Sequence, residues 1–578
     1  MDICFKDSCR ESEWQASIPG IFYNLKDKIL SISNATTRTD QLPKPLTTEA
    51  VYMICVLVCF LTLSLVGSSI TAFEYFYKAN AKKNEACYVK HAMKATSSEK
   101  KTKEFGHSAS DGLLNKMKRF LKCFCFVQNG RKILARETSK EKEISCVHGL
   151  RATNFCWAVY IHTCMYYILL IKNLEDQGPF LTSWFMKAIT RGDFLNDAFF
   201  TLGNNYFLKF FFSLRRKSLT DSLGITLEFP KASSIFFTDL EKKCFEIVTT
   251  QIIDRLKKQV VAPLYMIVLS FYTTLFPYFG SGPLWPTYSI HPVCKNVWLW
   301  NLLFVNNFQT PNNQCMLWTW YLATDFQFFT LSPIFIILLC KKPKLGYILT
   351  GICIFGSCLT NFLIAYNYNL TTDTFRIGFH LSDFRGFIEG DLELFYRLFE
   401  KPYTRVSSYL IGILLGHYLS KRNMGTATKT SSVFLCCGWI FTAISLWISF
   451  FFLGNAEEPL LNFAVFNGMR HLLFAFITSW FIFVCSTGQA EVFNRFLSMH
   501  GFVVLSRLSY SAYLTHLLLV EYHFFSLTEL GEFSLTHMVI KGSCVLFWTF
   551  PVSFVLSAII EMPISRLYSM LSWKQKND

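Results

Sequence analysis

One apolar stretch of the chain carries an arginine and a histidine eleven residues apart, Arg151 and His162. In an α-helix eleven residues rise about 16 Å and return to within about 20° of the same face, so both side chains would lie on one stripe. An ionisable residue inside a membrane span is costly and is by default a functional candidate. A guanidinium suits an anionic phosphate group, and a neutral imidazole suits removal of a hydroxyl proton. The spacing leaves open an alternative, an interfacial arginine and a histidine that bridges helices.

The chain around this pair has the composition of a membrane protein. Of its 578 residues 52% are hydrophobic and 17% are charged, whereas soluble globular proteins have about 25% charged residues. The apolar residues fall in blocks of about 20, the length with which a helix crosses a bilayer. We predict an all-α, polytopic helical bundle and exclude a soluble enzyme, a nucleic-acid-binding domain and a disordered scaffold. About eleven spans are predicted, at residues 51–77, 152–172, 194–214, 260–278, 317–340, 345–367, 403–420, 432–453, 464–486, 501–525 and 537–560.

The net charge of +16 is unevenly distributed. Between Lys78 and Glu143 there are 17 Lys or Arg residues and 7 Asp or Glu residues, whereas between Met1 and Ala50 there are 6 and 7. Because basic residues collect on the cytoplasmic side of membrane helices, we predict an exterior amino terminus and, after eleven spans, a cytoplasmic carboxyl terminus. We interpret the basic surplus as orientation and contact with anionic membrane lipid, and we expect no nucleic-acid partner.

This topology divides the chain into five parts. They are an exterior segment (1–50), a leading transmembrane helix (51–77), a basic cytoplasmic linker (78–147), a ten-helix domain (148–565) and a cytoplasmic tail (566–578).

The predicted exterior segments carry features of the secretory route. An oxidising compartment permits disulfides, and glycosylation sequons mark exterior loops. We therefore expect a multi-pass protein of the plasma membrane or the endoplasmic reticulum. The chain has no paired Cys-x-x-Cys spacing, and we expect no metal site. The disulfide candidates are Cys4, Cys9, Cys294 and Cys315, and the sequon asparagines are Asn34 and Asn369.

Further short motifs follow His162 in a fixed order. They are Asn196-Asp197-Ala198-Phe199-Phe200, the aromatic segment from Cys294 to Asn307, Trp320-Tyr321-Leu322-Ala323-Thr324-Asp325-Phe326-Gln327, Lys401-Pro402-Tyr403-Thr404-Arg405, the run from Arg507 to His516, and Glu561-Met562-Pro563. With the arginine and histidine in the first helix of a ten-helix block, this order resembles the acyltransferase-3 membrane family. The leading helix is similar to the family's nose-resistant-to-fluoxetine-like animal branch. The resemblance covers roughly residues 145–565.

The resemblance implies transfer of an acyl group from cytoplasmic acyl-coenzyme A to a hydroxyl of a lipid, carbohydrate or small-molecule acceptor, with no tightly bound cofactor. His162 would be the general base, and Arg151 would bind or orient the donor. Asp197 and Asp325 are candidates to fix the imidazole tautomer or to bind the acceptor, the alternative for each being an assembly pair with a buried Arg or Lys. Candidate substrate-binding residues are Asn196, Trp320, Tyr321, Gln327, Arg405 and His516.

For two of these candidates we favour another role, a structural one for His516 and an interfacial anchor for Arg405. The chain also departs from the family pattern, since Gly203-Asn204 stand where a Ser-Gly pair is usual. Two other functions therefore stay open. One is a carrier of lipids or hydrophobic small molecules that uses the same polar stripe as a passage. The other is a catalytically inactive member that binds or assembles.

Overall fold

The computed structural model describes nine stretches of the chain and four single residues. They are residues 44–92, 112–136, 146–173, 195–203, 263–370, 395–421, 430–451, 459–529 and 531–577, with residues 180, 183, 189 and 192. Within these stretches the secondary structure is helical, and the sole β contact is an isolated bridge between Ile171 and Gly531. The predicted all-α fold is confirmed. Cys4, Cys9, Asn34 and Asn204 lie outside the described residues.

Seven described helices are long and apolar enough to cross a membrane, so the protein is a multi-pass membrane protein. They are α3 (Thr48–Ala92), α14 (Trp320–Lys341), α15 (Pro343–Asn367), α18 (Ser432–Phe451), α19 (Leu460–Ser486), α21 (His500–Phe525) and α22 (Leu535–Leu556). The other four predicted spans coincide with shorter or more polar helices. These are α6 (Cys146–Leu169), α9 (Leu195–Gly203), α12 (Pro263–Ser270) with the π turn η3 (Phe271–Leu275), and α17 (Pro402–Lys421).

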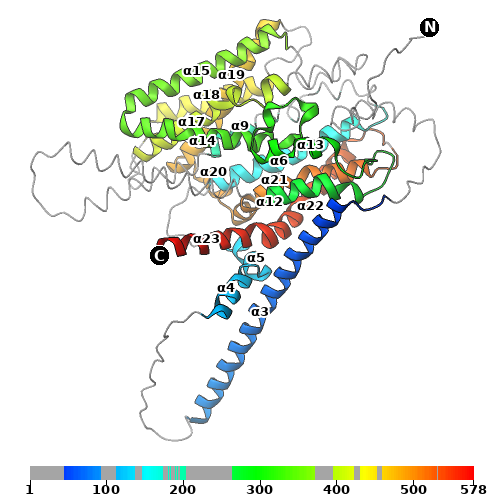
Figure 1. The fold of residues 1–578 in the computed structure, drawn as a ribbon. Coiled ribbons are helices and arrows are strands. Elements are labelled where there is room, and N and C mark those ends of the chain that lie inside the picture. The colour runs from blue at the N-terminus through cyan, green and yellow to red at the C-terminus, as the bar shows by residue number, and fades with distance from the viewer. Residues whose placement is uncertain are drawn as a thin grey trace, which may run out of the picture.

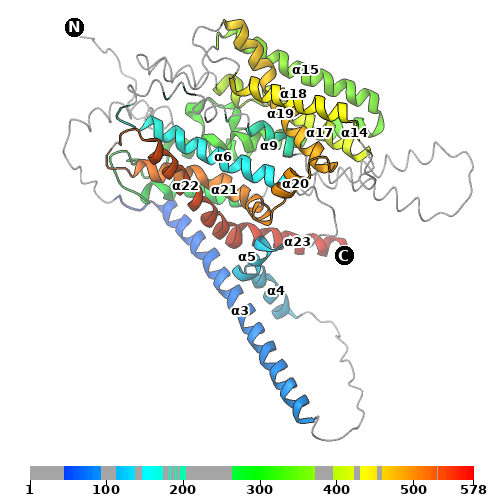
Figure 2. The same ribbon diagram turned by 180° about the vertical axis from the view of Figure 1, so that it is seen from behind.

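The helices form two groups joined by α9. In one group α6 packs against α21 and α22, and in the other α17 and α19 pack against each other and against α15. The short helix α9 contacts α6, α17 and α19, so it touches both groups (Figure 1). The leading helix α3 extends away from the two groups, with α4 (Leu113–Cys123) and α5 (Phe126–Leu134) beside it (Figure 2). The space between the two groups is where a site can form.

Polar side chains face the interior of the bundle, and apolar ones face outward. On α19, Asn467, Arg470 and His471 are all buried, whereas Phe355 on α15 and Val433 on α18 are 68% and 72% exposed. Lipid solvates apolar side chains, and ionisable ones are tolerated when they face partners inside the bundle. This distribution is the one expected of a helical membrane protein.

Asp197, near the start of α9, is hydrogen-bonded to two other helices. Its Oδ2 accepts from Arg405 Nη1 of α17 at 3.3 Å and from His471 Nδ1 of α19 at 2.8 Å. Its Oδ1 accepts from Ser408 Oγ at 2.9 Å. The Arg470 Nε–H donates to His471 Nε2, so the proton of a neutral His471 lies on Nδ1, the atom that faces Asp197. Asp197 and Arg405 are both 0% exposed, and they form a buried ion pair.

A second polar cluster holds the segment between α13 (Pro292–Leu302) and α14. Cys294 and Cys315 form a disulfide in this segment. Asn301 Nδ2 donates to the Cys315 carbonyl oxygen at 2.7 Å. Lys401 Nζ donates to the Asn307 carbonyl oxygen at 2.6 Å and to Glu400 Oε1 at 3.0 Å. These contacts fix the segment that carries Phe304 to the interior of the protein. The sequon residue Asn369, just after α15, is exposed.

Breaking the buried ion pair is expected to destabilise the fold strongly. Asp197→Ala leaves the Arg405 guanidinium buried without its carboxylate, and such a change costs about 3–5 kcal/mol. Ser408→Ala removes the hydroxyl that donates to Asp197 Oδ1 and to the His471 carbonyl oxygen, and it should cost about 1 kcal/mol. Thermal unfolding of the two purified variants in lipid nanodiscs measures the difference. Equal midpoint temperatures for the two would contradict this role of Asp197.

Glu400 makes the stability of the second cluster depend on pH. Burial raises the pKa of Glu400 to about 7, from an ordinary value of 4.5, and this effect outweighs the opposing one of Lys401. The folded protein therefore keeps a proton on Glu400 that the unfolded chain releases, so the stability from this group is present below pH 4.5 and is lost as pH rises through about 7. Glu400→Gln should flatten the fall in unfolding temperature across this range. Glu491→Gln, at an exposed carboxylate, is the control, and an unchanged slope in Glu400→Gln would refute the assignment.

Candidate active site

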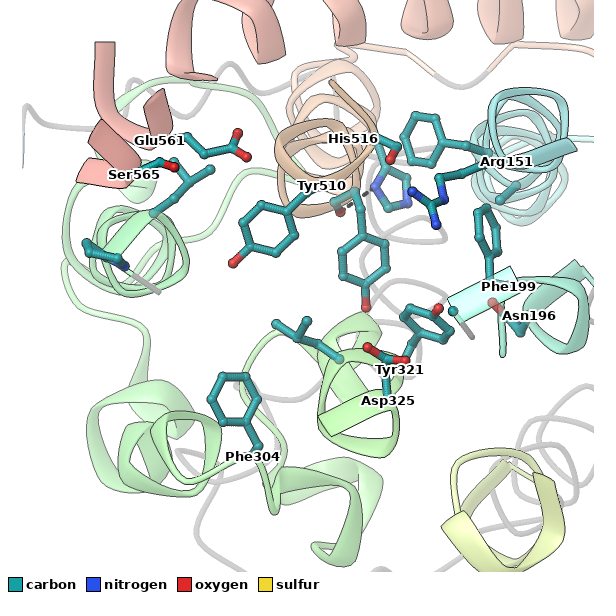
Figure 3. Close-up of a pocket in the computed structure, with 18 of the residues that line it drawn as sticks. Arg151, Asn196, Phe199, Phe304, Tyr321, Asp325, Tyr510, His516, Glu561 and Ser565 are labelled. Carbon is teal, nitrogen blue, oxygen red and sulfur yellow. Dashed lines mark hydrogen bonds between the residues drawn. The ribbon is translucent and has the colours of Figure 1, made fainter. Parts of the chain in front are cut away.

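A cavity of about 440 Å³ lies between α6, α9, α12, α14, α21 and the carboxyl-terminal helix α23 (Met562–Asn577). Its walls are mainly aromatic and aliphatic, with a few polar groups that converge on one space (Figure 3). Binding sites for small molecules commonly have this composition. Six residues predicted from the sequence line the cavity, namely Arg151, His162, Asn196, Tyr321, Asp325 and His516.

His162 and His516 form a hydrogen-bonded pair on the cavity wall. His162 Nδ1 of α6 lies 3.1 Å from His516 Nε2 of α21. His516 Nδ1 lies 2.7 Å from the carbonyl oxygen of Tyr513, one turn earlier on the same helix. Because a carbonyl oxygen only accepts, His516 Nδ1 carries the proton and donates it. The Nε2 of a neutral His516 is then an acceptor, and His162 Nδ1 is the donor to it.

This chain of hydrogen bonds assigns the tautomer of His162. With its proton on Nδ1, the neutral imidazole of His162 has an unprotonated Nε2. Among the described residues none hydrogen-bonds to this nitrogen, and the half-buried His162 ring lines the cavity. An unprotonated imidazole nitrogen open to a cavity can take a proton from a hydroxyl group. The site therefore has the geometry of a general base that is held in one orientation.

Arg151 lies on the same wall, towards the amino-terminal end of α6. Its half-buried guanidinium lines the cavity, and no acidic side chain in the described part of the chain forms an ion pair with it. In Figure 3 the Arg151 side chain points from α6 into the cavity. A cation without a carboxylate partner can bind an anionic group of a ligand, and the planar guanidinium matches phosphate well.

The opposite wall carries Asp325 of α14 with Asn196 and Gly203 of α9. A Cβ atom at position 203 would lie 3.2 Å from Asp325 Oδ1, so glycine leaves room for the carboxylate. The ring of Tyr321 packs against Phe199 at 6.1 Å and against Tyr513 at 5.7 Å between centroids. This wall thus combines the polar side chains of Asp325 and Asn196 with aromatic surface.

Comparison with known proteins identifies the fold that carries this cavity. The profile of the family described as "Acyltransferase domain" (acyltransferase 3) matches residues 144–560. The chain belongs to this acyltransferase family. It is 25% identical over 508 residues to Nose resistant to fluoxetine protein 6 of Caenorhabditis elegans, covering 83% of this chain and 56% of that protein. It is 29% identical over 317 residues to Regulator of hypoxia-inducible factor 1 of the same organism, covering 51% of this chain and 60% of that protein. The chain thus spans less than two thirds of the length of either relative, and no solved structure matches it.

Four candidates lie outside the cavity of the acyltransferase domain. Asp197 and Arg405 bind each other, which is the assembly role that the sequence had left open for Asp197. The expectation that Arg405 is an interfacial anchor is wrong, because its side chain is 0% exposed. Trp320 packs its ring 5.1 Å from the Arg405 guanidinium carbon. Gln327 Nε2 donates to Asn307 Oδ1 and to the Phe304 carbonyl oxygen, both at 2.9 Å. All four make contacts inside the protein next to residues that line the cavity, and none of the four lines it.

His516 joins two helices, which agrees with the structural role favoured from the sequence, and it also lines the cavity. It is buried and lines the cavity, where it orients His162. The tautomer-fixing role expected of Asp197 or Asp325 is thus filled by a second histidine. A pattern in α21 could have revealed it, because Ser509, Tyr510, Tyr513 and His516 recur at the spacing of one helix face, and all four line the cavity.

The cavity residues that carried no assigned role in the sequence interpretation include three near the carboxyl-terminal end of the chain. Glu561, Ser565 and Tyr568 line the end of the cavity formed by the π turn η11 (Ser557–Glu561) and by α23. Glu561 belongs to one of the quoted motifs, but the spacing of that motif does not indicate what it faces. In the described residues no group of three or more His, Cys, Asp or Glu side chains could hold a metal ion.

The tautomer assignment gives a direct spectroscopic expectation. In nitrogen NMR of protein with isotope-labelled histidine, the resonances lost in His162→Ala should be those of an Nδ1-protonated neutral ring. His516→Ala removes the acceptor and should give a mixture of tautomers at His162, whereas His516→Gln can supply a carbonyl oxygen in its place and should preserve the native form. An Nε2-protonated His162 in the unmodified protein would contradict the assignment.

Proposed function

We propose that the protein is a membrane O-acyltransferase that moves an acyl group from acyl-coenzyme A to a hydroxyl of a lipid, carbohydrate or small-molecule acceptor. The observation that carries the proposal is the His162 imidazole, whose Nδ1 is hydrogen-bonded to His516 and whose ring lines the cavity. The family of the chain supports acyl transfer as the reaction. The identity of the donor, of the acceptor and of the base is proposed in addition to this reaction.

The reaction follows from the tautomer of His162. Its Nε2 takes the proton of the acceptor hydroxyl as the oxygen attacks the thioester carbonyl carbon. The tetrahedral intermediate then collapses, the carbon–sulfur bond breaks, and the leaving thiolate takes the proton from the His162 imidazolium. The products are an ester and free coenzyme A, and the enzyme returns to its starting state. His516 keeps the ring in the orientation that both proton transfers require.

Arg151 supports an acyl-coenzyme A donor. It lies about 16 Å from His162 along α6, a separation that follows from eleven residues of helix. A phosphate group at Arg151 and a thioester near His162 would place the donor along one wall. Asn196, Tyr321 and Asp325 on the facing wall can position the acceptor hydroxyl by hydrogen bonds.

The proposal includes an orientation in the membrane. The basic surplus between Lys78 and Glu143 supports a cytoplasmic linker, an exterior amino terminus and a cytoplasmic carboxyl terminus. Arg151, near the start of α6, would then face the cytoplasm, from which the donor enters. The plasma membrane and the endoplasmic reticulum both fit this orientation, and membrane lipid surrounds the spans in either.

Release of free coenzyme A from labelled acyl-coenzyme A by the purified protein in lipid tests the function. His162→Ala should lower the rate about 10²–10⁴-fold with unchanged expression and unfolding temperature. His417→Ala is the matched control, because His417 is a buried histidine outside the cavity that contacts Tyr347 Oη at 2.9 Å.

The outcomes separate the candidate functions. A folded parent protein that releases no coenzyme A from several donors, with a crude lipid extract as acceptor, would refute the enzyme proposal. Transport of a lipid that survives His162→Ala would instead favour a carrier.

A further inference from the structure

Glu561 presents a carboxylate oxygen to the cavity from a π turn. The turn η11 ends α22 at this residue, and such turns inside helices are frequent at functional sites. Ser511 Oγ and Ser557 Oγ both donate to Glu561 Oε2 at 2.7 Å. Two donors on one oxygen fix the direction of the carboxyl group. The Glu561 carboxyl group points into the cavity in Figure 3.

The other oxygen, Oε1, is available to a ligand. In the part of the chain that the structure describes, no side chain donates to Oε1, and no Lys or Arg forms an ion pair with Glu561. Glu561 is half-buried and lines the cavity, so Oε1 can accept from a ligand that supplies a donor. Arg151 on the same cavity lacks an acidic partner in those residues, and Glu561 lacks a basic one.

The π turn is held by a helix outside the family domain. Asn129 Nδ2 of α5 donates to the Ala558 carbonyl oxygen within the turn at 3.0 Å. Arg507 Nη1 of α21 donates to the carbonyl oxygens of Ile133 and Ala135, at the end of α5, at 2.9 and 2.7 Å. The position of Glu561 is therefore fixed from two sides.

Contacts between α6 and α21 place Glu561 on the Arg151 side of the histidine pair. His148 Nδ1 lies 3.0 Å from Ser506 Oγ, and His162 Nδ1 lies 3.1 Å from His516 Nε2. The two helices therefore run in the same direction, and Arg151 and Ser511 both lie between these two contacts. Since Ser511 bonds Glu561, the carboxylate lies at a level along the two helices between Arg151 and His162.

We propose that Glu561 accepts hydrogen bonds from the pantetheine arm of coenzyme A, which rests on the proposed function above. The arm joins the phosphates to the thioester, carries no charge, and bears amide N–H and hydroxyl groups. A carboxylate repels phosphate but accepts from such donors. Arg151 then binds the phosphate end of coenzyme A, and Glu561 binds the arm. Ser565 and Tyr568 of α23 line the same end of the cavity as Glu561.

The test divides coenzyme A into its two halves. Calorimetric binding of coenzyme A, adenosine 3′,5′-bisphosphate and phosphopantetheine is measured on the full chain in nanodiscs. Glu561→Gln should weaken coenzyme A and phosphopantetheine about ten-fold, as expected for loss of a hydrogen bond to a charged group, and leave the bisphosphate unchanged. Arg151→Ala should weaken coenzyme A and the bisphosphate. Glu491→Gln, at an exposed carboxylate that does not line the cavity, should change none of them.

Each result bears on one of the two proposals. If the parent protein binds coenzyme A and Glu561→Gln binds it equally well, the role of Glu561 is wrong and the proposed function stands. A folded parent protein that binds no coenzyme A contradicts the proposed function. Should Glu561→Gln fold poorly, Ser511→Ala, which removes one of the two orienting donors, should give the same ligand profile with a smaller change.

Discussion

The buried ion pair between Asp197 and Arg405 fixes the position of α9, on which the cavity depends. Successive residues of a helix point about 100° apart, so holding Asp197 against α17 and α19 directs its neighbour Asn196 to another side. On that side Asn196, Phe199 and Gly203 line the cavity. A charge buried in the bundle requires a partner, and this requirement fixes a helix of only nine residues. The ion pair shapes the site without taking part in its chemistry.

The opposite wall is set by a ladder of polar contacts between α6 and α21. His148 meets Ser506, His162 meets His516, and Tyr166 Oη meets Glu521 Oε1 at 3.3 Å. Inside a bilayer the apolar surfaces of two helices gain little from meeting each other, so hydrogen bonds and close packing determine the register. A slip of one turn would break all three contacts. The pair of histidines therefore helps to fix the register of the two helices and also lines the cavity.

The parts of this structure that depend on a single helix could be predicted from the sequence. Apolar blocks located the spans, and the eleven-residue spacing placed Arg151 and His162 on one stripe that does line the cavity. Contacts between distant helices could not be predicted, because periodicity says which face a residue occupies and not which helix meets it. Asp197 and Arg405 are separated by 208 residues, and His162 and His516 by 354. The interfacial role assigned to Arg405 failed for this reason, and the contact between His516 and His162 could not be foreseen.

A histidine partner for His162 has a physical advantage over a carboxylate in this place. Orienting the ring requires only an acceptor for Nδ1–H, and a neutral imidazole supplies one without adding a charge to the middle of the bundle. A carboxylate there would need its own buried cation or would cost several kcal/mol of desolvation (about the usual penalty for a buried ion). In the proposed reaction, the neutral pair leaves the positive charge of the transition state to be balanced by the oxyanion that forms beside it. If His162 is the base, the charges of the site are balanced only when the proposed acyl donor and hydroxyl acceptor are both bound.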